Sequence, residues 1–351
     1  MKILFQIPSL YTIYAGRTIY YGYKHAFEDL GHEFKALTAD DSPKKILSEF
    51  RPEIVFTSLN DYNLKYFPKE SIKAYKGQGA KIFVNIPFWK SPMSKLRINE
   101  AQSISDNYDY IKFIKSGDFG DVYYNICEQN DPRMDGFEKH TGYKYYTIPL
   151  AADKMVLEKS KFMRKFASDI SFIGTNLPER RNYLDKNIFS MREQYKIRLY
   201  GQDWTFLEKM QGWAQRGGQY FNIPFLRSIQ KPKLSLEDEG NIYASSIISI
   251  NVHEEYQRRF GGDCNERTFK IPMAGGFEIV DNVECIKKYF KTGQEIILAK
   301  DKKDWFDKID YYIKHPERRI PIIEAGRKRI LREHTYHNRV NQLLDIYKSI
   351  K

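Results

Sequence analysis

The sequence has few cysteines and no long apolar run. Its three cysteines, Cys127, Cys264 and Cys285, show no C-x-x-C spacing, so neither a disulfide framework nor a zinc site is predicted. No apolar stretch approaches the roughly 20 residues that a membrane-spanning helix needs. The opening residues, MKILFQIPSL, suit a first β-strand better than a secretory signal, whose apolar region is longer. These absences predict a cytoplasmic protein without a transmembrane segment.

Common nucleotide-binding and catalytic motifs are also missing. No G-x-G-x-x-G follows the first strand-like run, and no G-x-x-x-x-G-K-[ST] phosphate loop is present. The chain lacks the G-x-S-x-G nucleophile motif and the H-E-x-x-H zinc motif. A D-x-D metal motif is absent as well.

Positive charge is plentiful but uneven along the 351 residues, whose net charge is +12. Residues 1–150 contain 20 basic and 18 acidic side chains, a net +2, whereas the rest contain 37 and 27, a net +10. An excess confined to one half indicates that this half meets an anion. The anion could be a nucleotide diphosphate, a polyanionic acceptor, an acidic lipid surface or nucleic acid. The alternative is a solvated basic face that serves solubility.

Strand-like and helical segments alternate along the chain. Lys2–Pro8, Ile54–Leu59 and Lys81–Pro87 are apolar runs typical of buried strands, and Tyr110–Ile114 is also expected to be a strand. A second alternation begins at Asp169. Such alternation is typical of parallel sheets with helical crossovers, so we predict an α/β fold with two doubly wound, Rossmann-like domains. The predicted parts are residues 1–150, residues 151–335, and a final amphipathic helix over residues 336–351.

The stretch NERTFKIPMAGGFEIVDN, residues 265–282, is the most informative. It predicts a helix from Arg267 that ends at Gly275 and Gly276, where a strand begins. In an open α/β sheet, ligands lie at the carboxyl ends of the strands, where helix N-termini offer free N–H groups. Arg267 adds a cation and Thr268 a hydroxyl, so the stretch predicts a nucleotide diphosphate site. A C-capping glycine beside a surface arginine is the alternative.

Two glycine turns fit the same pattern. In FIGTNLPERR, Gly174 follows a strand, and Asn176 and Arg180 are polar candidates for ligand contact. RLYGQDW places Gly201 after the next strand. One such turn is weak evidence, because glycine ends many strands, but several in one domain favour ligand binding.

Polar residues also follow the apolar run SIISI. In NVHEE, Asn251 and His253 should reach the carboxyl end of the sheet. His253 is a candidate for proton transfer or for binding a sugar hydroxyl or a phosphate. A structural role is the alternative for a single histidine.

The second half resembles the CgeB-like (spore maturation protein) glycosyltransferases, within the wider glycosyl transferases group 1 superfamily. The resemblance extends from about Tyr146 to Tyr347 and includes IPLAADK, DISFIGTNLPERRNYL, RLYGQDW, LSLEDEGNIYASSIISINVH and NERTFKIPMAGGFEIVDN. It implies a GT-B fold, in which two Rossmann-like domains face a central cleft and the last helix crosses back to the first domain. It also implies a nucleotide-sugar donor held mainly by the second domain, without a cofactor or an essential metal.

One position departs from the family pattern. The family usually reads Arg-x-Phe-Glu in the helix at Arg267, and that Glu commonly holds the donor ribose, whereas this chain has Lys270. A lysine cannot accept hydrogen bonds from ribose hydroxyls but can bind phosphate. Either ribose recognition has moved, with Glu266 as a candidate, or the donor preference is unusual, or activity is reduced. Asp263 lies near the position of the first motif acid of retaining relatives.

The resemblance implies transfer of a sugar from a nucleoside diphosphate sugar to a hydroxyl-bearing acceptor. The acceptor could be a glycan, a glycopolymer, a protein or a nucleic acid, and peripheral contact with an anionic surface is also open. His25, Asp61 and Asp118 are conceivable general bases. Two alternatives remain: a non-catalytic binding protein of the same fold, suggested by Lys270, and a transferase that glycosylates DNA bases, suggested by the basic excess.

Overall fold

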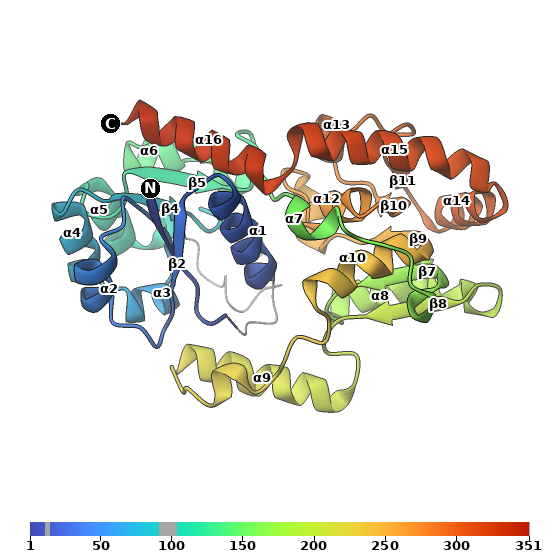
Figure 1. The fold of residues 1–351 in the computed structure, drawn as a ribbon, viewed down its shortest axis with the longest axis horizontal. Helices are drawn as coiled ribbons and strands as arrows, with labels where there is room; N and C mark the ends of the chain where they lie inside the picture. The colour runs from blue at the N-terminus through green and yellow to red at the C-terminus, as the bar shows by residue number, and fades with distance from the viewer. Residues whose placement is uncertain (11–14, 91–103, 351) are drawn as a thin grey trace. The chain divides into compact units, whose positions relative to one another are not determined.

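The computed structural model describes residues 1–10, 15–90 and 104–350. The chain divides into two compact units, each built on one parallel β-sheet (Figure 1). Unit 1 comprises Met1–Pro149, Ala214–Ile229 and Val340–Lys351, and unit 2 comprises Leu150–Trp213 and Gln230–Arg339.

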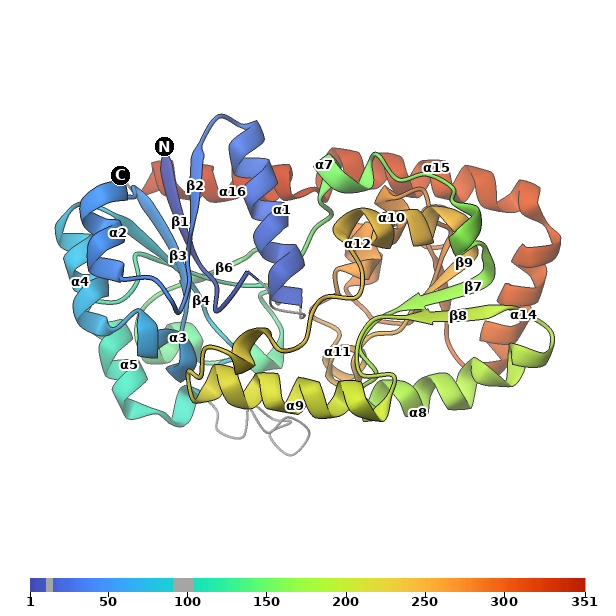
Figure 2. The ribbon, with the colours of Figure 1, turned by 60° about the horizontal axis from the view of Figure 1, so that its bottom comes forward.

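Unit 1 contains a six-stranded sheet with the order β2-β1-β3-β4-β5-β6, whose strands lie side by side in Figure 2. The central strands are apolar on both faces because helices flank a parallel sheet on both sides. The strands are β1 (Lys2–Gln6), β2 (Glu33–Leu37), β3 (Ile54–Ser58), β4 (Lys81–Asn85), β5 (Val122–Asn125) and β6 (Tyr145–Thr147). The helices are α1 (Ala15–Asp29), α2 (Pro43–Phe50), α3 (Asp61–Tyr66), α4 (Lys69–Gly77), α5 (Tyr108–Lys115) and α6 (Phe137–Thr141).

Unit 2 contains a five-stranded sheet with the order β11-β10-β9-β7-β8. Two apolar clusters, one on each side of this sheet, form its core. The strands are β7 (Ser168–Ile173), β8 (Ile197–Tyr200), β9 (Ser246–Asn251), β10 (Glu278–Asp281) and β11 (Ile297–Ala299). The remaining helices are α7 (Lys154–Leu157), α8 (Pro178–Asn187), α9 (Phe206–Tyr220), α10 (Leu236–Ser245), α11 (Glu255–Phe260), α12 (Arg267–Met273), α13 (Ile286–Tyr289), α14 (Lys302–Lys314), α15 (Pro316–Glu333) and α16 (Tyr336–Ser349).

Local sequence explains where several helices begin. Ser42 accepts a hydrogen bond from the Lys45 N–H, and Pro43 occupies the first turn of α2. Ser235 and Asp301 cap α10 and α14 in the same way. These polar residues satisfy backbone N–H groups that a helix leaves without an internal partner.

One predicted strand is wrong. Tyr110–Ile114 belongs to α5, which begins after Asn107, whose side chain accepts a hydrogen bond from the Tyr110 N–H. The apolar residues of this segment recur at helical spacing, and Phe113 and Ile114 are buried on one side of the helix. β5, further along the chain, is the strand that pairs with β4.

The division between the units falls within two helices, after Trp213 in α9 and after Arg339 in α16. The segment Ala214–Ile229 groups with unit 1, although the sequence pattern placed all of residues 151–335 in one domain. Among the described residues, no helix is long and apolar enough to cross a membrane.

Candidate functional site

Two glycine turns touch at the carboxyl end of the unit 2 sheet. Gly174 follows β7 and Gly201 follows β8, and the Gly174 N–H donates to the Tyr200 carbonyl over 3.0 Å. Gly201 has a φ of 109°, and a Cβ on it would lie 2.5 Å from the Gly174 carbonyl oxygen. The Trp204 indole N–H donates to that same oxygen over 3.0 Å. Only glycine fits at position 201, and the two turns are therefore in direct backbone contact beside the strand ends.

Arg267, the first residue of α12, reaches toward this turn. Its Nε donates to Asn251 Oδ1 over 3.0 Å, and one terminal nitrogen donates to the Val252 carbonyl over 2.9 Å. The other terminal nitrogen lies 3.3 Å from where a Cβ on Gly174 would lie. The guanidinium is thus held at the Gly174 backbone by contacts that leave one N–H edge pointing to the turn.

A second arginine approaches from α8. Arg180 is buried, donates to the Thr175 carbonyl over 2.8 Å and lies 3.7 Å from Glu254. Burial, followed by the nearby charge of Arg267, lowers the pKa of Arg180 to about 10. Its Nε has no hydrogen-bond partner among the described residues, and the same holds for the buried Asn176 Oδ1. Glu254 partly balances the charge of Arg180, but a buried N–H donor without an acceptor costs free energy unless a ligand supplies one.

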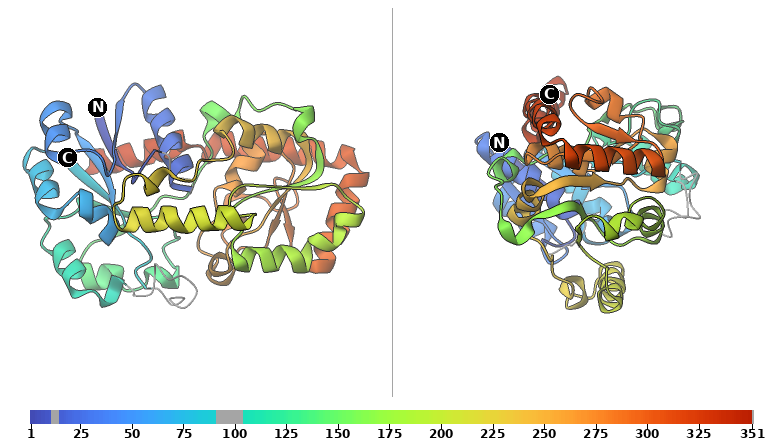
Figure 3. Two further views of the ribbon diagram at one scale, coloured as in Figure 1. Left: turned by 90° about the horizontal axis from the view of Figure 1, so that it is seen from below. Right: turned by 90° about the vertical axis from the view of Figure 1, so that its right-hand side faces the viewer.

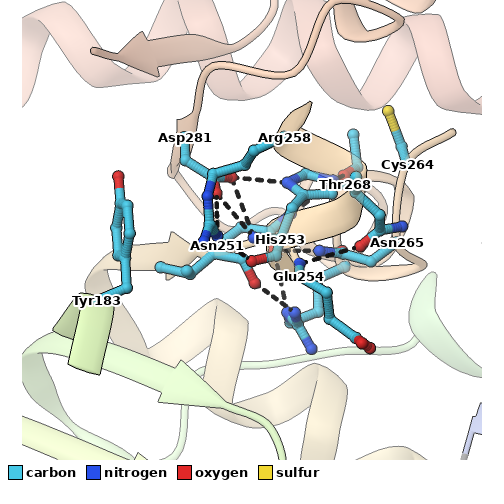
Figure 4. A network of polar contacts seen from close by, with 12 residues as sticks. Tyr183, Asn251, His253, Glu254, Arg258, Cys264, Asn265, Thr268 and Asp281 are labelled. Carbon is cyan, nitrogen blue, oxygen red and sulfur yellow. Dashed lines mark hydrogen bonds and ion pairs between the residues drawn. The ribbon is translucent and has the colours of Figure 1, made fainter. Parts of the chain in front are cut away.

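His253, which follows β9, is fully buried against Asp281 at the end of β10. Figure 4 shows the two side chains together with Arg258 from α11. His253 Nδ1 lies 2.6 Å from Asp281 Oδ1, and the His253 N–H donates to Asp281 Oδ2 over 2.9 Å. Burial alone would raise the pKa of Asp281, but the His253 ring and Arg258 outweigh it, and the pKa falls below its usual value. Asp281 therefore fixes the orientation of the His253 ring.

The other ring nitrogen of His253 faces Thr268 in α12. His253 Nε2 lies 3.2 Å from Thr268 Oγ1, which also accepts a hydrogen bond from Asn251 Nδ2 over 3.0 Å (Figure 4). Asn251 Nδ2 donates to Glu278 Oε1 as well, over 2.9 Å. Burial raises the pKa of Glu278 to about 8. Thr268 thus has protein partners on both sides and serves as a link in a buried network.

Lys270 lies in a buried cluster of opposite charges. Its Nζ is 3.1 Å from Glu266 Oε2 and 3.3 Å from Glu239 on α10. Burial opposes the charged form of Lys270, but the two carboxylates outweigh it and raise the pKa. The Tyr336 hydroxyl donates to Glu266 Oε1 over 2.7 Å. The lysine therefore neutralises two carboxylates, a pairing that the sequence did not predict.

The remaining predicted residues occupy different positions. Asp263 is buried and accepts a hydrogen bond from Gln257 Nε2 over 2.6 Å. Gly275 and Gly276 form the turn from the carboxyl end of α12 into β10, where the Gly276 N–H donates to the Ile271 carbonyl. They lie at the opposite end of the helix from Arg267, and none of their described contacts joins them to the two arginines.

Several members of the site were missed from the sequence. Asp281, Arg258, Glu278 and Glu239 were not singled out, although Asp281 ends the apolar run FEIVD at the edge where ligands bind. His253 follows β9 and Asp281 ends β10; these two strands are neighbours in the sheet, and strand order is not readable from residue spacing. Two thiols also meet unexpectedly: the sulfurs of the free cysteines Cys264 and Cys285 lie 2.7 Å apart.

Comparisons with known proteins agree with this architecture. A family model described as "Glycosyl transferase-like" matches residues 180–345. A comparison with curated protein sequences finds no match.

Solved structures of similar fold cover nearly the whole chain. An alpha-glucosyltransferase in complex with UDP-glucose and DNA containing an abasic site is 11% identical, with a TM-score of 0.64 over 98% of each chain. HepE from Anabaena, in complex with UDP and glucose, is 9% identical, with a TM-score of 0.60 over 99% of this chain and all of its own. Sucrose-phosphate synthase from Thermosynechococcus elongatus is 9% identical, with a TM-score of 0.62 over 99% of this chain and 98% of its own.

The shared architecture establishes the GT-B fold that the sequence predicted. The family match across most of the second half agrees with the resemblance to the glycosyl transferases group 1 superfamily. The family match and the fold together support a transferase enzyme of the GT-B type.

Proposed function

We propose that this chain transfers a sugar from a nucleoside diphosphate sugar to a hydroxyl-bearing acceptor without an essential metal. The observation that carries the proposal is the pair of arginines at the Gly174 turn. Arg180 is buried with a spare donor, and Arg267 is held with one edge at the same backbone. Two guanidinium cations at one turn suit a diphosphate, whose oxygens accept bidentate hydrogen bonds.

The same groups account for catalysis in this proposal. When the bond between the sugar and the diphosphate breaks, negative charge develops on the leaving oxygen. In this proposal Arg180 and Arg267 stabilise that charge, since preorganised donors of this kind contribute much of an enzyme's rate enhancement. The cations take the role that a metal has in other sugar transferases.

The buried network behind the arginines positions them. Asn251 accepts from Arg267 and donates to Thr268, which meets the His253 ring held by Asp281. Since His253 is fully buried, we assign it a positioning role. For Asp263 we propose a positioning role of the same kind.

The Lys270 cluster suits ribose recognition in an altered form. Glu239 and Glu266 are both held beside α12 by Lys270, so carboxylate oxygens remain near the position where the CgeB-like family carries its Glu. We propose that one of these carboxylates accepts the ribose hydroxyls. The CgeB-like assignment belongs to this proposal and rests on the sequence blocks named above.

A thermal-shift titration with UDP, UDP-glucose and the other nucleoside diphosphates, with and without EDTA, tests the proposal. A ligand that binds only the native state raises its stability by about 2.7 kcal/mol at a hundredfold excess over its Kd. We expect a shift with one nucleotide that EDTA leaves unchanged and that Arg267→Ala or Arg180→Ala abolishes.

Arg181→Ala is the matched control, because Arg181 lies on the same helix but is exposed and pairs with Asp185. Its nucleotide shift should equal that of the unmodified protein. No shift with any nucleotide would contradict sugar transfer and favour the binding-protein alternative. Loss of the shift in EDTA would contradict metal independence alone.

DNA is a second candidate acceptor. The alpha-glucosyltransferase with a similar fold was solved with DNA, and this chain carries a net charge of +12. DNA binding that weakens steeply with salt, together with sugar transfer to DNA, would support this candidate. Transfer to a glycan acceptor without DNA binding would exclude it.

A further inference from the structure

Helix α9 exposes an apolar stripe along its length. Phe206, Met210, Trp213 and Tyr220 recur at spacings of four, three and seven residues, so they lie on one side of the helix. All four are exposed, Phe206 by 77% and Trp213 by 58%. A single exposed apolar residue needs no explanation, but a continuous stripe marks an interaction surface.

The opposite side of α9 packs on polar groups. A Cβ on Gly212 would lie 2.9 Å from Asp203 Oδ1, and Gln230 Nε2 donates to the Glu208 carbonyl over 3.2 Å. Asp203 and Gln230 are both buried. The helix therefore turns its polar side inward and its apolar side outward, the reverse of an ordinary surface helix. In the left view of Figure 3, α9 is the long helix drawn in yellow.

Exposed apolar residues continue beyond the helix. Phe221 and Phe225 are exposed by 70% and 73%, in the loop that follows α9. Residues 205–233 carry five basic side chains and one acidic side chain. The acidic residue, Glu208, pairs with Lys233, and the buried Arg227 pairs with Asp40. Lys209, Arg216 and Lys231 are the other basic residues of the segment. The apolar surface thus lies within a segment of net positive charge.

We propose that α9 and the loop after it dock this protein on an anionic lipid surface. An amphipathic helix with Trp, Phe and Met on one side and Lys or Arg beside them lies in the membrane interface, where its apolar side enters the boundary of the acyl chains. Aromatic rings favour that depth, and basic side chains are attracted to anionic headgroups. The surface is distinct from the arginine pair and stands whether or not sugar transfer is the reaction.

Charge distinguishes this occupant from two others. A second copy of the chain would bring two positively charged segments together, and like charges across an interface oppose association. Duplex DNA attracts Lys and Arg but leaves a stripe of Phe, Met and Trp in water, because its outer surface is phosphate and sugar. An anionic bilayer accommodates both the apolar stripe and the charge.

Vesicle co-sedimentation of the full chain tests the proposal. Vesicles of phosphatidylcholine alone are compared with equimolar phosphatidylcholine and phosphatidylglycerol. We expect binding to the anionic vesicles that weakens at high salt, and a loss of about tenfold in Phe206→Ser, because one buried aromatic contributes roughly a tenfold partition or more.

Phe162→Ser is the matched control, since Phe162 is also an exposed aromatic of unit 2 but lies outside α9. Lys209→Glu in α9 should weaken binding, and Lys302→Glu in α14 should not. Equal losses in Phe206→Ser and Phe162→Ser, or no vesicle binding by the unmodified protein, would overturn the proposal. Self-association that Phe206→Ser abolishes, without vesicle binding, would assign the surface to a second copy.

Tryptophan fluorescence gives an independent readout. Of the four tryptophans, Trp89 and Trp305 are fully buried and the Trp204 indole N–H bonds to the Gly174 carbonyl, whereas Trp213 is exposed. Lipids with a spin-label quencher in the acyl chain should quench the unmodified protein on binding. Trp213→Phe should still bind these vesicles but lose the quenching. Equal quenching in Trp213→Phe would show that another part of the chain enters the bilayer and would overturn the proposal.

Discussion

The two sheets differ in where they place a buried carboxylate. In unit 2, Asp281 ends β10, at the carboxyl edge of the sheet, and accepts from the His253 backbone, the His253 ring and Arg258. In unit 1, Asp121 directly precedes β5, at the amino edge, and accepts from the Ile82 N–H over 2.8 Å and from Lys76 over 3.1 Å. Asp281 therefore orients side chains at the sheet edge where ligands bind in α/β folds, whereas Asp121 joins elements at the opposite edge of the other sheet.

The difference shows how similar chemistry serves two purposes. Lys76 and Asp121 are each about one-fifth exposed, so water shares in their charges. Asp281 and His253 are fully enclosed. An enclosed network resists rearrangement, which suits a site that must hold two arginines in place for an anion. A pair that is only one-fifth exposed, such as Lys76 and Asp121, has the simpler task of joining the start of β5 to β4 and α4.

The largest expected difference is in the free energy of unfolding that is lost when Asp281 or Asp121 is replaced by alanine. Asp281→Ala leaves the backbone and ring N–H groups of His253 without an acceptor and removes the carboxylate beside Arg258, and we expect a loss of about 3–5 kcal/mol in the free energy of unfolding. Asp121→Ala should lose about 1 kcal/mol, since Lys76 can be solvated. Urea unfolding measures both, and Asp281→Asn serves if the alanine variant does not fold. Equal losses in the two variants would contradict the proposed difference.

The glycine turns offer a second comparison. Gly201 has a positive φ and no room for a Cβ beside Gly174, whereas Gly79 in unit 1 has a φ of 91° with open space around it. Gly201→Ala should therefore lose about 3 kcal/mol of stability, from strain and overlap together, and Gly79→Ala about 1 kcal/mol from strain alone. Thermal unfolding of both variants is the measurement. A Gly201→Ala variant as stable as Gly79→Ala would mean that the two turns of unit 2 are not packed together.

The sequence predicted the fold well because its signals are local. Apolar runs and glycine stops mark parallel strands and crossover helices wherever they occur, and two α/β units follow from their alternation. The strand expected at Tyr110–Ile114 failed because a short apolar segment fits either period. Its cap at Asn107 was the deciding feature.

The candidate site was predicted only in part because its partners are distant in sequence. Gly174, Arg180, Asn251, His253, Arg267 and Thr268 were named, and the structure brings them to one edge of one sheet. The position of Lys270 relative to Glu239 depends on how α10 packs beside α12, which no spacing within either helix reveals. The apolar stripe of α9 also went unnoticed, because its spacing is that of a core helix and only the fold turns it outward.

The smallest effect concerns Glu278, the buried carboxyl in the network of unit 2. Burial raises its pKa to about 8, so between about pH 4.5 and pH 8 the native state holds a proton that the unfolded state releases. Stability should therefore fall as pH rises through this range, by about 1 kcal/mol between pH 6 and pH 7. Glu278→Gln keeps an acceptor for Asn251 but cannot titrate, so it should remove the part of the slope of stability against pH that Glu278 causes.

Glu49→Gln, at an exposed carboxylate of unit 1, is the control and should leave the slope unchanged. Urea unfolding across the pH range measures all three proteins, and a slope that persists in Glu278→Gln would mean that Glu278 is already ionised in the native state.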